Sequence, residues 1–180
     1  MKTFEFSVIA SGLDPRADDF EDRFFKAGCD DATIVFQKGL IVLDFARRAE
    51  SLARALATAL ADVRKTGAKV ERFEPDYLVS LSDIAARSGL SRAAISLYGK
   101  GERGRGFPAP VARVTTESPL WDWVDVARWL CRHGKLPREA VAEAHMVREA
   151  TILSRSKPAT PSKLAKLLED RLKTAEALSA

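Results

Sequence analysis

The chain has 180 residues, 46% of them hydrophobic, and its 29 basic and 25 acidic residues give a net charge of +4. This composition excludes a disordered chain and allows one medium domain or two small folded domains. No run approaches the roughly 20 apolar residues of a membrane-spanning helix, and the first residues lack the apolar stretch of a signal peptide. Two cysteines, Cys29 and Cys131, are too few for a disulfide scaffold, so we expect a cytoplasmic protein with reduced thiols and no membrane partner. The Ala- and Arg-rich composition is typical of a bacterium with a GC-rich genome.

Residues 1–75 predict a ferredoxin-like α+β domain. Apolar residues alternate as in strands, or recur as on one helical face, in the order βαββαβ. The expected elements cover residues 4–8, 17–27, 33–37, 40–45, 51–65 and 69–73. This order is the split-βαβ pattern, which hosts sensors, dimerisation modules, nucleic-acid binders and enzymes, so it fixes no function.

Residues 81–98 predict a helix-turn-helix. Two helices that cross through a tight turn need a small residue at the contact, a turn residue that tolerates positive φ, and an apolar plug, and Ala85, Gly89 and Ile95 meet these needs. Ser82 and Ser91 stand where we expect the N-caps of the two helices. We expect the remaining core positions to be filled by Ile84, Leu90 and Tyr98. An ordinary helical hairpin is the alternative interpretation.

A glycine-rich basic segment, residues 99–108, follows the second helix. It matches the pattern G-x-G-x-x-G, but a dinucleotide site needs a strand before the glycines and a helix after them, and here a helix precedes and prolines follow. We therefore reject a nucleotide-binding function. The glycines, interleaved with Lys100, Arg103 and Arg105, predict a flexible loop that follows a phosphate backbone; a solvated connector is the alternative.

Residues 111–114 and 120–123 are predicted to pair as a β-hairpin, followed by a helix from Val124 to Cys131. Alternation and helical spacing place at least two of the three tryptophans, Trp121, Trp123 and Trp129, in the core. The segments LSDIAARSGLSRAAI, FPAPV and LWDWVDVARWL resemble, in order and spacing, the winged helix-turn-helix domains of MerR-like and phage-excisionase-type DNA-binding proteins. The resemblance covers residues 81–130 and implies that the second helix reads DNA while the hairpin acts as a wing.

A recognition helix places its N-terminal and outward side chains in the major groove of double-stranded DNA. Arg92 is the expected base reader, because its guanidinium can span O6 and N7 of a guanine; a phosphate contact or a solvated side chain is the alternative. Arg113 is the basic residue of the hairpin, whose tip carries Glu117. The predicted DNA-binding residues are Ser91, Arg92, Ala93, Ser96, Leu97, Lys100, Arg103, Arg105 and Arg113.

Residues 136–180 predict a helical arm. A helix over 137–154, a break at Lys157-Pro158-Ala159 and a cap at Thr160-Pro161 precede a last helix with an apolar stripe. Its residues, Ala165, Leu168, Leu172 and Ala175, recur every three or four positions. The stripe can fold back on this chain, pair with a second copy or bind another protein; a regulator that binds two half-sites favours a homodimer.

No motif for catalysis is present, and we expect neither an enzyme nor a cofactor. Cys131 and His133 could supply two metal ligands, but a closed site needs about four, so we expect no metal. We predict domains over 1–75, 76–135 and 136–180 and a sequence-specific transcriptional regulator. It could act as an antitoxin that binds a cognate toxin. Alternatives are a protein-interaction adaptor with a vestigial helix-turn-helix and an excisionase-like architectural DNA-binding protein.

Overall fold

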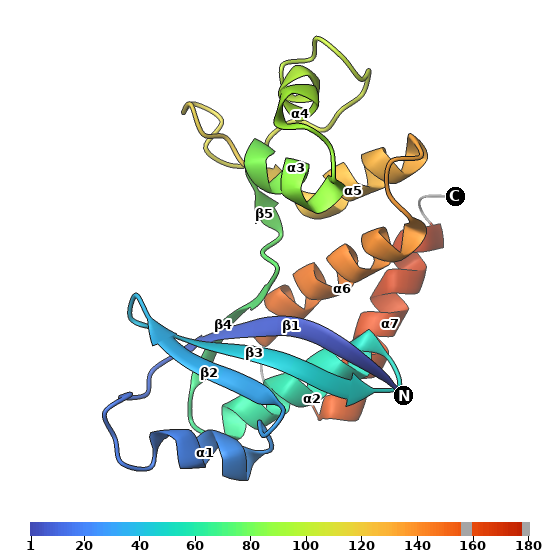
Figure 1. Cartoon of the computed structure of the whole chain (residues 1–180). Coiled ribbons are helices and arrows are strands. Elements are labelled where there is room, and N and C mark those ends of the chain that lie inside the picture. Colours follow the sequence, from blue (N-terminus) through green and yellow to red (C-terminus); the bar gives the residue numbers. More distant parts are fainter. Residues whose placement is uncertain (156–159, 178–180) are drawn as a thin grey trace. The chain divides into compact units, whose positions relative to one another are not determined.

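The computed structural model describes residues 1–155 and 160–177 (Figure 1). In this part of the chain, seven helices accompany a four-stranded antiparallel sheet and a two-stranded sheet, a mixed α+β structure. The chain forms two compact units: Met1–Pro75 with Met146–Ala180, and Asp76–His145. Among the described residues, no helix has both the length and the apolar character needed to cross a bilayer.

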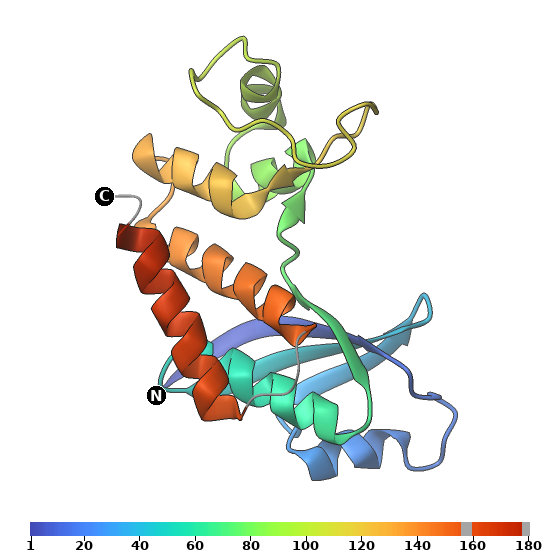
Figure 2. The same cartoon turned by 180° about the vertical axis from the view of Figure 1, so that it is seen from behind.

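The four-stranded sheet and two helices form the N-terminal part of the first unit. The elements are β1 (Lys2–Ser11), α1 (Phe20–Ala27), β2 (Ala32–Gln37), β3 (Leu40–Ala49), α2 (Leu52–Lys65) and β4 (Lys69–Glu74). The strand order is β2-β3-β1-β4, and every neighbouring pair is antiparallel. Helices α1 and α2 lie on one face of this sheet (Figures 1 and 2).

Local sequence explains these elements. Phe6 and Val8 point to the same side of β1, so they bury one face of the strand against Phe24 of α1 and the Ala/Leu-rich face of α2. The side chain of Ser51 caps α2 by accepting a hydrogen bond from the Arg54 N–H at 3.2 Å. Gly28 ends α1 in the left-handed conformation, at φ 100°.

The C-terminal helices are α6 (Arg138–Ser154) and α7 (Pro161–Ala177). Leu164 and Leu168 of α7 are buried in the core of the first unit, where α7 packs on α2. The Arg54 guanidinium donates to the Ser162 hydroxyl at 2.8 Å along the same contact. Part of the apolar stripe therefore folds back on its own chain, the first of the three alternatives. The predicted break at 157–159 lies outside the described residues.

The second unit contains β5 (Leu78–Val79), α3 (Leu81–Ser88), α4 (Arg92–Gly99), β6 (Trp121–Asp122), α5 (Trp123–Arg132) and the first residues of α6. Ile84 and Ile95 are fully buried where α3 and α4 meet, and Gly89 makes the turn between the helices at φ 69°. The predicted core role of the tryptophans is confirmed: Trp121, Trp123 and Trp129 are 2%, 7% and 7% exposed.

Two local predictions in the second unit were wrong. Ser80, not Ser82, caps α3: its hydroxyl accepts from the Asp83 N–H at 3.2 Å, while the Asp83 carboxylate accepts from the Ser80 N–H at 2.8 Å. The hairpin over 111–123 is reduced to an isolated bridge between Ala112 and Leu120.

Two features of the chain explain why the hairpin is short. Arg113 adopts a left-handed conformation at φ 52°, which turns the chain one residue after the bridge. Trp121 and Asp122 pair with Val79 and Leu78 instead, so the expected second strand of the hairpin belongs to a different sheet.

Candidate nucleic-acid interface

The first turn of α4 is an exposed, capped helix end. Ser91 accepts a hydrogen bond from the Ala94 N–H at 3.1 Å, and Ser91, Arg92 and Ala93 are all exposed. Ile95 faces the core and is fully buried. The amphipathic pattern thus turns the start of the helix outward, where it can meet a ligand.

Further along α4 the predicted contact residues are less accessible. Ser96 and Leu97 are half-buried, and Tyr98 is 7% exposed against Phe107 and Trp129. The structure therefore brings Ser91, Arg92 and Ala93 together on one exposed turn and places Ser96 and Leu97 at its margin.

Arg92 is held by the preceding helix. Its guanidinium donates a hydrogen bond to the Ser82 hydroxyl, and both side chains are exposed. Hydrogen bonds from the Ser80 side chain and backbone, with the nearby charges of Arg87 and Arg92, lower the pKa of Asp83. A pairing between the first turns of α3 and α4 thus orients the side chain that we expect to read a base. Sequence reasoning missed this role of Ser82.

Backbone hydrogen bonds anchor the basic loop 100–106 to the rest of the second unit. The Trp129 indole N–H donates to the Arg105 carbonyl at 3.3 Å, and the backbone N–H groups of Glu102 and Arg103 donate to the Leu97 carbonyl at 3.0 and 3.2 Å. Gly104 packs where a Cβ would lie 2.7 Å from Tyr98 Cδ1.

This anchoring leaves the charged side chains of the loop outward. Lys100, Arg103 and Arg105 are exposed, while the loop backbone rests on the aromatic core of the unit. Cations on a fixed backbone can follow a row of phosphates at a smaller entropy cost than cations on a mobile loop.

Loop 111–120 carries the last predicted contact. Arg113 is exposed, and its carbonyl accepts from the Thr116 N–H at 3.0 Å and the Thr116 hydroxyl at 2.9 Å, which closes a tight turn. Val111 and Val114 are 55% and 64% exposed beside it. In both views this loop and loop 100–106 flank α4 (Figures 1 and 2).

Arg87 belongs to the structure of the unit rather than to the exposed surface. Its guanidinium donates to the Asp76 carbonyl at 2.7 Å and lies over the Trp123 ring, 5.4 Å from the centroid. The exposed cations around α4 are therefore Arg92, Lys100, Arg103, Arg105 and Arg113.

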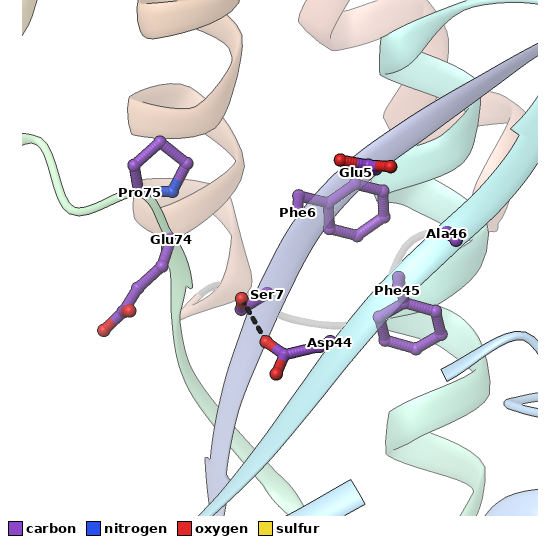
Figure 3. Close-up of a pocket in the computed structure, with 8 residues that line it drawn as sticks. All are labelled: Glu5, Phe6, Ser7, Asp44, Phe45, Ala46, Glu74 and Pro75. Carbon is purple, nitrogen blue, oxygen red and sulfur yellow. Dashed lines mark hydrogen bonds between the residues drawn. The ribbon is translucent and has the colours of Figure 1, made fainter. Parts of the chain in front are cut away.

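A hollow on the four-stranded sheet has the opposite charge. Glu5, Asp44 and Glu74 line it, and the Ser7 hydroxyl donates to Asp44 Oδ1 at 2.5 Å (Figure 3). None of its eight lining residues, all within the described stretch 1–155, is basic. A surface of this charge repels phosphates, so it does not extend the interface around α4.

The described residues hold no group of three or more His, Cys, Asp or Glu side chains that could bind a metal ion. Comparison with known proteins adds no relative, since no family model, curated protein or solved structure matches the chain. The surface around α4 is therefore the feature of the chain from which a function can be inferred.

Proposed function

We propose that the second unit is a winged helix-turn-helix domain of the MerR-like or excisionase type, and that the chain is a transcriptional regulator that binds specific double-stranded DNA. The supporting observation is the exposed, capped first turn of α4, flanked by two loops with outward cations. A helix of this kind places its first turn in the major groove, and flanking cations contact the phosphates. Loop 111–120 would serve as a short wing.

The two parts of the interface have different roles in this proposal. Arg92 reads a base after it releases Ser82, while Lys100, Arg103, Arg105 and Arg113 neutralise phosphates without regard to sequence. The exchange at Arg92 costs little, because an exposed hydrogen bond is replaced by one to the base. The N-terminal βαββαβ elements, which we assign to the ferredoxin-like fold, would supply dimerisation, sensing or docking.

The test is fluorescence anisotropy with purified protein, DNA from upstream of its own gene, and a scrambled duplex of equal composition, at two salt concentrations. Specific regulators typically bind their site about 10³-fold or more tighter than unrelated DNA. Preference for the upstream DNA at both salt concentrations supports the proposal. Equal binding to both duplexes that disappears with salt contradicts it, because this is the behaviour of nonspecific charge attraction.

A further inference from the structure

The two edges of the four-stranded sheet differ in their protection. β4, at one edge, carries Lys69, Glu71, Arg72 and Glu74, its pairing with β1 is interrupted by a register shift, and Pro75 follows it. Charges, bulges and prolines of this kind prevent an edge from pairing with another strand. β4 is therefore a blocked edge.

β2, at the other edge, has no charged residue, no proline and no register shift in its pairing with β3. Its sequence, ATIVFQ, also contains no glycine. Val35 and Phe36 are 44% and 45% exposed, and a strand directs half of its backbone hydrogen-bonding groups to each side. β2 is thus an unprotected edge that can accept a further strand.

The charges at the two ends of β2 are complementary to each other. Asp30 lies in the turn before the strand, Lys38 lies in the turn after it, and both are exposed. In an antiparallel pair of two such strands, the acidic end of one copy lies beside the basic end of the other. This self-complementarity identifies a second copy of the chain as the partner that fits the edge.

We propose that β2 pairs antiparallel with β2 of a second copy, so that two four-stranded sheets join into one. Both copies keep their helices on the same face of the joined sheet if the two-fold axis passes through a residue and not between two residues, because opposed side chains then belong to the same face in each copy. A two-fold axis at Ile34 meets this condition and brings the turn that holds Asp30 beside the turn that holds Lys38 of the second copy. It also sets the small Ala32 beside the large Phe36.

Neighbouring registers lose the charge pair. An axis at Val35 or at Thr33 slides one copy along the other by two residues, which moves the turn that holds Asp30 away from the turn that holds Lys38. This dimer would form whatever the function of the second unit. It uses a surface other than α7, of which Leu164, Ala165 and Leu168 are buried within the chain.

Sedimentation equilibrium of the full chain tests the proposal. We expect a concentration-dependent dimer, and Val35→Lys should weaken it at least about tenfold, because the substitution adds the kind of charge that protects β4. Val111→Lys, a matched change at an exposed valine of the second unit, should leave the dimer intact. Circular dichroism confirms that both variants are folded. A chain that stays monomeric to about 100 µM, or a dimer that Val35→Lys does not weaken, overturns the proposal.

Charge reversal tests the register. Asp30→Lys alone and Lys38→Asp alone each place like charges at both ends of the paired strands, so each should weaken the dimer several-fold. A mixture of the two single variants restores both attractions, and the heterodimer should form in preference to either homodimer. Equal dimerisation in every combination overturns the register centred on Ile34.

Discussion

Ser82 and Arg92, ten residues apart, join the first turns of α3 and α4 through a hydrogen bond from the guanidinium to the hydroxyl. The contact lies on an exposed surface, where a hydrogen bond contributes little to stability but restricts the rotamers of a long side chain. Arg92 is therefore oriented in the free chain, and in the proposed complex with DNA it would exchange one partner for another.

The first prediction concerns this exchange. Arg92→Ala should weaken binding to the cognate DNA by about 1–3 kcal/mol and leave binding to scrambled DNA nearly unchanged, because a bidentate contact to guanine carries sequence preference. Ser82→Ala should keep the preference, since it removes only the competing partner. Anisotropy titrations on both duplexes measure the two effects. Equal losses on cognate and scrambled DNA in the Arg92 variant would show that the side chain contacts a phosphate.

The second prediction concerns the salt dependence of DNA binding. Replacement of Lys100, Arg103 or Arg105 by Ala should reduce the slope of log K against log salt by roughly 0.9 for each phosphate that the variant no longer neutralises, on any duplex. Arg16→Ala, a change at an exposed arginine of the first unit, is the control and should leave the slope unchanged. A slope that is the same in the loop variants and in the wild type would remove the loop from the interface.

Periodicity predicted the helices and strands because their burial follows from local spacing. The alternation of Phe6 and Val8, and the order of the six N-terminal elements, agree with the sheet and its two helices. The turn at Gly89 was predictable because the position needs a positive φ, and the cap at Ser91 because Ser before a helix is a strong signal.

The errors have nonlocal or competing causes. The pairing of β5 with β6 joins residues more than 40 positions apart, and no local pattern indicates that Trp121 prefers Val79 over a hairpin partner. The true cap of α3 was recognisable, because Ser80 and Asp83 have the spacing of a capping box. The anchoring of loop 100–106 depends on Trp129, which is distant in sequence, so the composition of the loop gave no sign of this contact.

The third prediction concerns the buried arginine of the first unit. Arg47, 6% exposed, donates to Asp31 at 2.9 Å, to Asp62 at 2.8 Å and to the Gly28 carbonyl at 2.7 Å. Arg47→Ala leaves partly buried carboxylates without this partner and should lower the free energy of unfolding by about 3–5 kcal/mol.

Far-UV circular dichroism during urea denaturation measures this change. Arg23→Ala, which removes an exposed ion pair with Asp19, is the control and should leave the midpoint unchanged. If both variants unfold at the wild-type urea concentration, the network around Arg47 does not stabilise the unit.

The fourth prediction concerns thiol reactivity. Burial, with a further contribution from the Asp62 carboxylate, raises the pKa of the Cys29 thiol to about 12. Near neutral pH this thiol is therefore protonated as well as inaccessible, whereas Cys131 is half-buried. A thiol reagent should modify Cys131 in the native chain and reach Cys29 after unfolding, and Cys131→Ser should abolish the native reaction. Rapid native labelling of the Cys131→Ser variant would contradict the burial of Cys29.

The same pKa predicts a pH dependence of stability. An unfolded thiol loses its proton near pH 9.0, while the folded Cys29 keeps its proton up to about 12. The unfolded state therefore releases more protons as the pH rises through this window, and stability should fall. In Cys29→Ala this part of the alkaline loss should disappear, which denaturation at several alkaline pH values would measure.

The fifth prediction separates backbone strain from close packing in loop 100–106. Gly104 and Gly101 have nearly the same positive φ, 74° and 73°, but a Cβ at Gly104 would lie 2.9 Å from Trp129 Cη2, whereas a Cβ at Gly101 would meet nothing within 4 Å. Gly101→Ala should cost about 1 kcal/mol, the strain of a left-handed alanine. Gly104→Ala should cost about 1–3 kcal/mol more, because the clash forces the aromatic cluster apart.

Tryptophan fluorescence during urea denaturation measures both variants, because all three tryptophans lie in the second unit and report on that unit. The urea concentration at the midpoint of unfolding should be highest for the wild type, lower for Gly101→Ala and lowest for Gly104→Ala. Equal midpoints for the two variants would mean that the loop moves away from Trp129 without cost. This result would contradict the anchoring of the loop. It would also contradict the fixed arrangement of Lys100, Arg103 and Arg105 that we propose for phosphate binding.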